Sequence, residues 1–320
     1  MTHVLILGAS GMLGRKLCRE VQSALNASTL TLADVMAPDI PGGVPADTRA
    51  RAVDITDRAA LDELIAEKPN IIFHLAAIVS GEAEADFEKG YRINLDGTRN
   101  LFEAIRQTGA GTDYCPRVVF SSSLAVFGGP YPEQVPDSFL AAPQNSYGAQ
   151  KAMSELLLAD YSRRRIFDGV GLRLPTICVR PGAPNKAASG FFSNIIREPL
   201  QGKPALLPVP DTLRAWLASP RAAVKNLLLA AELDTSQLGA RRTFNLPGLS
   251  VTVAEQIEAL RDVAGAAAVG LIERQLDPSV EDIVSAWPAR FDAALATALG
   301  FQADASFASI ISNFLEDDME

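Results

Sequence analysis

Val4-Leu-Ile-Leu-Gly8-Ala-Ser-Gly11-Met-Leu-Gly14, at the start of the 320-residue chain, is the stretch that decides the fold. Its apolar run, residues 4–7, is typical of a strand buried on both faces. After the glycines, apolar residues recur every four positions, which predicts a helix over residues 12–25. A strand, a glycine-rich turn and a helix in this order form an anion-binding site, because unpaired N–H groups and the positive end of the helix dipole meet at the turn.

The three glycines and a later acid together indicate which anion binds. Gly8 would allow the tight turn, Gly11 would let a pyrophosphate approach the backbone, and Gly14 would let helix and strand pack closely. A glycine trio alone also fits an ordinary strand-to-helix turn. Asp34, however, ends the next apolar run, residues 30–34. An acid about 20 residues beyond the glycines suits the adenosine ribose hydroxyls and repels the extra phosphate of NADP, so the sequence predicts a dinucleotide site that prefers NAD.

Composition bounds the possible partners. The chain is 48% hydrophobic and 21% charged, with a net charge of −9, which argues against nucleic acid because phosphate binding calls for a basic surface. No apolar run reaches the roughly 18 residues of a membrane span, and no basic region precedes the first apolar run as in a signal peptide. Three separated cysteines are expected as buried free thiols, and two histidines cannot supply a metal site alone. These features favour a cytoplasmic enzyme with no metal and no membrane partner.

The pattern along the chain predicts an α/β protein with a Rossmann-type doubly wound parallel sheet and a smaller C-terminal substrate lobe. The expected strands cover residues 4–7, 30–34, 51–53, 71–75, 118–121 and 170–174, and the expected helices 12–25, 58–67, 90–108, 146–164, 252–263 and 289–299. After residue 181, repeated prolines predict a lobe of short, irregular pieces. We therefore expect an NAD-binding domain over 1–175 and a substrate lobe over 176–320, with a segment near 243–247 returning to the sheet.

Three serines and a Tyr–Lys pair indicate the chemistry. Ser121-Ser122-Ser123 ends an expected strand, and the carboxyl ends of strands line the ligand crevice of an open α/β sheet. Tyr147 and Lys151 would lie one turn apart on a helix. A phenol with a pKa of ~10 is a poor base at neutral pH, and a nearby ammonium ion favours the phenolate. A Tyr–Lys pair alone would be an ordinary surface pair, but with the serines and the dinucleotide turn it predicts acid/base chemistry on a substrate hydroxyl.

Several motifs together resemble the extended short-chain dehydrogenases/reductases, the NAD-dependent epimerase/dehydratase family. The matching positions, in order, are Gly8-Ala-Ser-Gly11-Met-Leu-Gly14, Asp54-Ile55, His74-Leu-Ala-Ala77, Asn94, Ser121–Ser123, Tyr147-Gly-Ala-Gln-Lys151 and Arg173-Leu-Pro175. The family includes UDP-galactose epimerase, uronate dehydrogenase and the short-chain type of L-threonine dehydrogenase. Relatives often dimerise through the two helices that correspond to residues 90–108 and 146–164, so the resemblance implies a homodimer.

The resemblance also implies roles for individual residues. Tyr147 would be the acid/base and Ser123 its hydroxyl partner, with Ser122 as the alternative because consecutive serines leave the register open. Lys151 would lower the pKa of the phenol and hold the nicotinamide ribose. Asn94 is counted among the cofactor-binding positions and is expected to brace the sheet rather than touch substrate, and His74 is expected to be a strand-end residue with its own hydrogen bond. The remaining cofactor positions are Ser10, Met12 and Leu13 in the turn, Asp54 and Ile55 beside the adenine, Leu75, Ala76 and Ala77 along the cofactor path, and Pro175 near the nicotinamide.

Three further stretches, residues 74–84, 87–94 and 189–194, resemble one bacterial group of this family in particular, which oxidises a small 2-hydroxy sugar acid at C2 with NAD. The carboxylate of such a substrate needs a cation or several donors. Arg180 or Arg214 is the expected cation, and Trp216 could wall the pocket. The expected substrate hydroxyl partners are Ser80, Ser122, Ser123, Thr176 and Ser189, with Tyr147 at the reacting oxygen.

A uronate- or L-threonine-type dehydrogenase of the same fold stays open as an alternative from the sequence, and so do two functions of other kinds. A sugar-nucleotide epimerase of the same fold would hold NAD tightly and grip a nucleotide diphosphate with basic residues. The candidates for that grip are Arg180, Lys186, Arg197, Lys203, Arg214 and Arg221. A regulator that binds NAD without turnover is the second alternative, although it would have no use for Ser123, Tyr147 and Lys151.

Overall fold

The computed structural model describes residues 2–182 and 188–319, which form two compact units. The first unit consists of the chain up to residue 126 together with segments 143–173 and 224–244. The second consists of segments 127–142 and 174–223 and of the chain from residue 245 on. Lys186, one of the basic residues considered for a diphosphate, lies outside the described residues.

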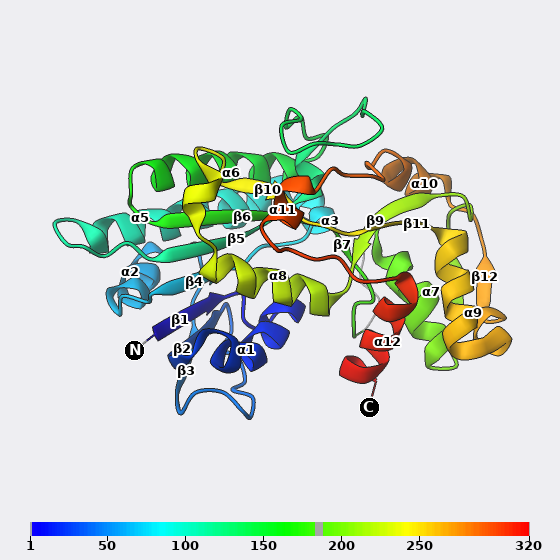
Figure 1. Ribbon diagram of the computed structural model, residues 1–320, viewed down its shortest axis with the longest axis horizontal. Coiled ribbons are helices and arrows are strands. Elements are labelled where there is room, and N and C mark those ends of the chain that lie inside the picture. The colour runs from blue at the N-terminus through cyan, green and yellow to red at the C-terminus, as the bar shows by residue number, and fades with distance from the viewer. Residues whose placement is uncertain (1, 183–187, 320) are drawn as a thin grey trace. The chain divides into compact units, whose positions relative to one another are not determined.

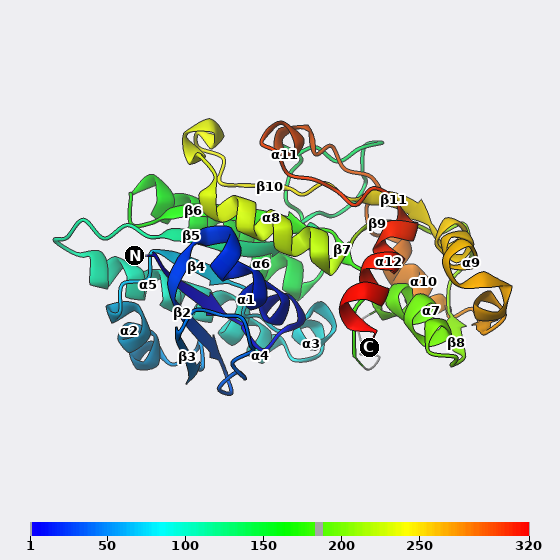
Figure 2. The same cartoon turned by 60° about the horizontal axis from the view of Figure 1, so that its bottom comes forward.

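A seven-stranded sheet in the order β10-β6-β5-β4-β1-β2-β3 is the centre of the first unit (Figures 1 and 2). β1 pairs in parallel with both β2 and β4, so the strand order reverses there, which makes this the ligand-binding switch point of a doubly wound sheet. The expected fold class is confirmed, and the strand expected near 243–247 lies beside β6. The strands are β1 (Thr2–Leu7), β2 (Ala27–Asp34), β3 (Asp47–Ala52), β4 (Ile71–His74), β5 (Arg117–Ser123), β6 (Asp168–Leu174) and β10 (Thr243–Asn245).

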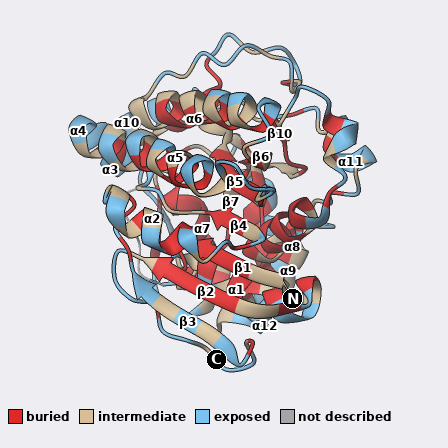
Figure 3. Cartoon of the chain, turned by 90° about the vertical axis from the view of Figure 1, so that its left-hand side faces the viewer, coloured by how far each residue is buried: buried red, intermediate tan, exposed pale blue. Residues whose placement is uncertain are grey.

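Helices cover both faces of this sheet. α2 (Arg58–Ala66), α5 (Thr98–Gly109) and α6 (Ser146–Arg163) lie on one face, and α1 (Met12–Leu25) and α8 (Pro220–Glu232) on the other (Figure 1). The strands between them are mostly buried, as Figure 3 shows. β1, β4 and β5 carry continuous apolar runs, which is typical of strands covered by helices on both faces, whereas β3, the last strand of the sheet, is largely exposed. Short elements complete the unit: α3 (Ser80–Ala85), α4 (Phe87–Gly90) and two 3₁₀ turns, η2 (Leu124–Val126) and η3 (Thr235–Leu238).

The helix expected over 90–108 is not one regular helix. It begins as a π-helix, η1 (Tyr91–Gly97), and continues as α5. A π-helix has more residues per turn than an α-helix and so changes the direction in which side chains point. The apolar period of α5 gives no sign of this change, which is why the sequence missed it.

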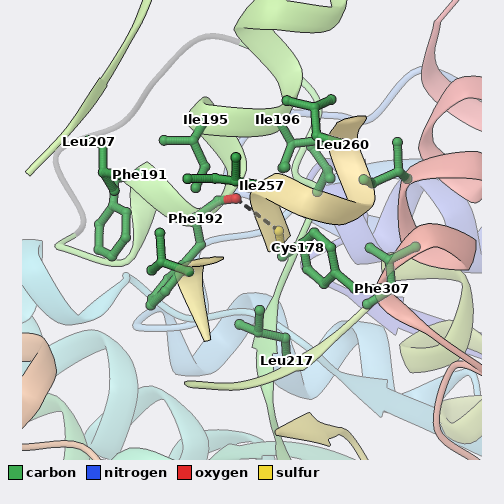
Figure 4. Packing of buried hydrophobic residues seen from close by; sticks show 14 of the residues in the cluster. Cys178, Phe191, Phe192, Ile195, Ile196, Leu207, Leu217, Ile257, Leu260 and Phe307 are labelled. Atoms are coloured by element: carbon green, nitrogen blue, oxygen red, sulfur yellow. Dashed lines mark hydrogen bonds between the residues drawn. The ribbon is translucent and has the colours of Figure 1, made fainter. Parts of the chain in front are cut away.

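The second unit has a three-stranded sheet, β11-β9-β7, and a strand pair, β12-β8, with helices packed around an apolar core. Phe192, Ile195, Leu217, Leu260 and Phe307 belong to that core (Figure 4). The expectation of an irregular lobe is wrong for much of this unit, because Pro199 falls in the last turn of its helix and does not break it. The elements are β7 (Thr176–Ile177), β8 (Ala205–Leu207), β9 (Arg214–Ala218), β11 (Leu249–Thr252), β12 (Ile272–Arg274), α7 (Gly190–Leu200), α9 (Val253–Val269), α10 (Pro278–Ser285), α11 (Ala294–Ala298) and α12 (Phe307–Asp318).

Three smaller findings bear on the expectations from composition. Cys18 and Cys178 are buried free thiols as expected, whereas Cys115 is exposed, because it lies in the surface loop before β5. Among the described helices none is long and apolar enough to cross a membrane. In the described part of the chain, no three His, Cys, Asp or Glu side chains are grouped so that they could hold a metal ion.

Candidate active site

Strand register brings the candidate residues to one edge of the first unit's sheet. Leu7 at the end of β1 pairs with Ala33 on β2 and with His74 on β4. His74 pairs in turn with Phe120 on β5. The residues that directly follow these paired positions therefore lie at the same level near the carboxyl ends of the strands. They are Gly8, Asp34, Leu75 and Ser121.

The three glycines of the turn differ in how closely other protein atoms approach them. Gly8 has a φ of +89°, and a Cβ there would lie 2.6 Å from the backbone nitrogen of Ala76. A Cβ on Gly14 would lie 2.3 Å from the carbonyl oxygen of Gly8. A Cβ on Gly11 would meet only that same oxygen, at 3.2 Å, and α1 begins after Gly11 without a side-chain cap. Helix N–H groups without a side-chain cap, beside the least crowded of these three glycines, fit a pyrophosphate.

Asp34 fits the adenosine end of a dinucleotide. Its carboxylate accepts hydrogen bonds from the N–H of Ser10, at 2.9 Å, and of Val35, at 2.8 Å. These bonds tie the glycine turn to the end of β2. The half-buried carboxylate keeps lone pairs that can accept from ribose hydroxyls. Met12 and Leu13, in the first turn of α1, are half-buried.

The other cofactor candidates take different places in the first unit. Asp54 is exposed and accepts from the N–H of Thr56 at 2.8 Å, whereas Ile55 is a core residue packed on Gly97. Leu75 and Ala76 form the backbone that approaches Gly8, and Ala77 is exposed.

Asn94 and His74 form the support behind the edge of the sheet. The Asn94 amide accepts from the Ile78 N–H at 2.9 Å and donates to the Ile78 carbonyl and to Gln150 Oε1. Asn94 therefore braces the loop after β4 against α6. His74 Nε2 lies 2.8 Å from Thr98 Oγ1, and burial lowers the pKa of this histidine to about 3, so it is neutral.

Lys151 lies between Tyr147 and the serine strand. Its Nζ donates to the Ser121 carbonyl at 2.8 Å and lies 5.7 Å from the centroid of the Tyr147 ring. Lys151 is 2% exposed, and this burial lowers its pKa to about 7, against the opposing effect of Glu155. An ammonium ion in so little water interacts strongly with a phenolate, because the local dielectric is low.

The three serines point to different partners. Ser121 Oγ donates to the His74 carbonyl at 3.1 Å. Ser122 is 2% exposed and donates to Glu155 Oε1 at 2.5 Å. Ser123 is half-buried, and its Oγ accepts from the Ala125 N–H at 3.2 Å, so its hydroxyl proton is not used in that bond.

Two residues that the sequence analysis missed hold the start of α6. A Cβ on Gly148 would lie 2.1 Å from the Ala125 carbonyl oxygen, so only glycine lets the first turn of α6 meet η2. The Glu84 carboxylate of α3 accepts from the Ser146 N–H at 2.7 Å, at the positive end of the helix dipole. A glycine in the first turn of an expected helix was the signal for Gly148. Glu84 had no signal, because its partner lies 62 positions away.

The substrate candidates of the second unit have protein partners of their own. Arg180 Nη2 donates to Ser189 Oγ at 3.3 Å, and the Arg180 backbone N–H donates to Ser193 Oγ at 3.0 Å. Arg214 Nη1 donates to the Ser250 carbonyl at 2.7 Å and lies 3.4 Å from the Glu255 carboxylate. The carboxylate of Glu255 therefore already compensates the charge of Arg214.

Three further candidates are placed by their elements. Ser80 is the first residue of α3, Pro175 is buried directly after β6, and Thr176 begins β7. Trp216 is half-buried, with its ring 5.7 Å from that of Phe291, and both rings line an open pocket of the second unit.

Three known proteins are closely similar to this chain. It is 50% identical to the D-erythronate dehydrogenase of Cupriavidus necator, over 98% of both chains. It is 46% identical to the D-erythronate dehydrogenase of Haemophilus influenzae, over 99% of both chains. A crystal structure titled as a nucleoside-diphosphate-sugar epimerase from Agrobacterium tumefaciens is 52% identical, with a TM-score of 0.96 over 99% of this chain and 94% of that one.

The profile described as "NAD dependent epimerase/dehydratase family" matches residues 4–238. Together with the two dehydrogenases, this match confirms the expected class of enzyme, an NAD-dependent oxidoreductase, and the expected cofactor. The glycine turn, Asp34 and the Tyr147–Lys151 pair lie within the matched range. The chain therefore belongs to the NAD-dependent epimerase/dehydratase family.

Proposed function

We propose that this protein oxidises a small 2-hydroxy sugar acid at C2, and that the acid is D-erythronate, which becomes 2-dehydro-D-erythronate. The observation that carries this proposal is the buried Lys151 ammonium beside the Tyr147 ring at the end of the serine strand. That arrangement suits the removal of a proton from a substrate hydroxyl. The two D-erythronate dehydrogenases at 50% and 46% identity support the choice of substrate.

In the proposed mechanism the protein positions the reactants and moves one proton. Tyr147, as phenolate, takes the proton from the C2 hydroxyl, and Lys151 stabilises that phenolate. Ser123 donates to the same substrate oxygen. Bound NAD supplies the acceptor for the hydride from C2. The gain in rate comes mainly from proximity and orientation.

The first unit has the groups to hold the cofactor. The N–H groups at the glycine turn would bind the pyrophosphate, Asp34 the adenosine ribose, and Lys151 the nicotinamide ribose. Asp54 and Ile55 would flank the adenine, and Leu75 to Ala77 would line the cofactor path. Pro175, which belongs to segment 174–223 of the second unit, would lie near the nicotinamide.

Ser123 is the better candidate of the two serines for the catalytic hydroxyl. Ser122 is buried, and its proton is given to Glu155. Ser123 is half-buried and keeps its proton for a substrate oxygen. We therefore assign the substrate hydrogen bond to Ser123.

The proposal is tested by mixing the protein with NAD and D-erythronate and following the absorbance of the reduced nicotinamide. We expect turnover with D-erythronate and much less with L-threonine or a uronate. No reduction of NAD with any of these acids would contradict the proposal. NAD binding without turnover of any substrate would favour the regulator.

A sugar-nucleotide epimerase is the second candidate, because the Agrobacterium structure at 52% identity carries that description. An epimerase needs cations in the second unit that are available for two phosphates. Arg197 and Glu198 form an ion pair at 2.7 Å, Arg214 lies near Glu255, and Arg221 binds Glu316 at 2.9 Å and also Asp317. Carboxylates thus compensate much of the positive charge that could bind a nucleotide diphosphate. This favours a small acid as the substrate. A nucleotide sugar that is consumed with no net reduction of NAD would favour the epimerase.

Arg180 is our candidate for the substrate carboxylate. Replacing Arg180 with methionine should raise the KM for D-erythronate by about tenfold or more, because a charge-assisted hydrogen bond to the substrate is lost. Replacing Arg214 with methionine is the matched control and should raise KM far less, because Glu255 compensates its charge. Steady-state kinetics at saturating NAD measures both. A larger effect at Arg214 would move the carboxylate site there.

We also propose a homodimer formed through α5 and α6. Leu156 on α6 is 73% exposed, which leaves a large apolar side chain for a partner to cover. We expect the mass in solution to be that of two chains and expect Leu156→Glu to yield a monomer. A wild-type mass of one chain only would reject the dimer.

A further inference from the structure

A buried carboxylate lies one helical turn beyond Lys151 and is used by none of the steps above. Glu155 is 7% exposed. Its Oε2 accepts from Arg173 Nη2 at 2.7 Å, and its Oε1 accepts from Arg173 Nε at 3.0 Å and from Ser122 Oγ at 2.5 Å. Three elements therefore meet at one carboxylate: β5 through Ser122, α6 through Glu155, and β6 through Arg173.

The groups that face Lys151 leave Glu155 as its counter-charge. From β4 comes His74, which is neutral, and from β5 the uncharged Ser121 carbonyl. From α6 come Tyr147 and Glu155, and Glu155 is bound in turn to Arg173 of β6. Glu155, one helical turn from Lys151, is the carboxylate whose charge raises the pKa of Lys151 against the effect of burial.

We propose that Glu155 is a positioning residue, which keeps Lys151 charged beside Tyr147 while Arg173 limits how strongly it does so. This inference rests on the proposed acid/base function of Tyr147. Without Arg173, the buried Glu155 carboxylate would stabilise the Lys151 ammonium very strongly. If Arg173 compensated the charge of Glu155 completely, Glu155 would not stabilise the Lys151 ammonium at all. Sharing between Arg173 and Lys151 gives an intermediate effect. The bond to Ser122 also fixes the strand end that carries Ser123.

The proposal predicts shifts of opposite sign for the two partners of one ion pair. Glu155→Gln removes the attraction and leaves Arg173 as a second buried cation, so the Lys151 ammonium should lose its proton at lower pH, by about one unit or more. Arg173→Met leaves Glu155 to Lys151 alone, so the proton should be lost at higher pH. The double variant Glu155→Gln/Arg173→Met should fall between Glu155→Gln and wild type.

The titration of Lys151 can be read without activity. NMR of protein labelled with ¹³C at lysine side chains follows the ammonium through its pH titration, and Lys151→Arg assigns the signal. The same order should appear in the alkaline limb of kcat/KM for D-erythronate, because Lys151 is charged below its pKa and loses its charge as pH rises through it. Thermal unfolding checks that each variant is folded.

The outcomes separate this inference from a purely structural role. If the ion pair were only structural, both single variants would be less stable than wild type. The pH at which Lys151 titrates would then stay unchanged, or it would move in the same direction in both variants. Either result would overturn the proposal. If Glu155→Gln does not fold, the double variant carries the test, because it removes both members of the Glu155–Arg173 ion pair and leaves neither of them buried without the other. A wild-type protein inactive on D-erythronate would end the proposed function, while the NMR titration would still test Glu155. If the Lys151 titration shifts in the variants but the pH profile of kcat/KM stays where it is in wild type, Glu155 has no role in turnover.

Discussion

Replacing Tyr147 with phenylalanine should lower kcat for D-erythronate roughly 10²–10⁴-fold and leave NAD binding nearly unchanged, because the variant loses only the hydroxyl that accepts the substrate proton. The ring remains, so its packing beside Lys151 remains as well. Turnover is measured by the absorbance of the reduced nicotinamide, and NAD binding by calorimetry.

A second tyrosine on the same helix is the matched control. Tyr161 bonds through its hydroxyl to Glu103, away from Lys151. Tyr161→Phe therefore removes the same atom from α6 at a place where no reaction is proposed, and kcat should stay within about twofold of wild type. Oxidation that continues undiminished in Tyr147→Phe would remove the basis of the mechanism.

The second large effect concerns two glycines in one turn. Gly14→Ala places a Cβ 2.3 Å from the backbone oxygen of Gly8, which no side-chain movement can relieve. It should destabilise the protein without NAD by about 1–3 kcal/mol, the usual cost of overpacking. Gly11→Ala meets only one protein atom, at 3.2 Å, so the protein should keep most of its stability. The affinity for NAD should still fall about tenfold or more, because the methyl group takes the space of the pyrophosphate.

Chemical denaturation without NAD and calorimetric titration with NAD give the two quantities. The opposite pattern, a destabilised Gly11→Ala and a stable Gly14→Ala, would contradict the division of the turn into a packing position and a phosphate position. Full NAD affinity in Gly11→Ala would place the pyrophosphate elsewhere.

Much of the fold could be predicted because its signals are local in the chain. The helix over 12–25 has the expected bounds, since its buried residues recur at helical spacing. The strands before Gly8 and Asp34 are apolar runs that end at polar or glycine residues. The second unit was harder to predict. α7 tolerates Pro199 in its last turn, and α12 lies against α9 far from it in sequence, so proline content was a poor guide there.

At the candidate site, the sequence identified the residue types and the structure identified their partners. The spacing of Tyr147 and Lys151 predicted a shared helix face, which α6 has. No pattern showed that Ser122 bonds to Glu155, 33 positions away, or that Arg214 lies beside Glu255. Each of these contacts changes which residue is the better candidate for a role.

The sequence by itself determined the doubly wound sheet, the glycine turn with Asp34, and the Tyr147–Lys151 pair. These depend on hydrophobic period, on backbone freedom and on spacing within one helix, all of which are local properties of the chain. Only the tertiary structure decided which serine keeps its hydroxyl proton and which carboxylate faces Lys151. Those features join β5, α6 and β6 across long sequence separations, and their energies depend on burial, which exists only once the chain has packed.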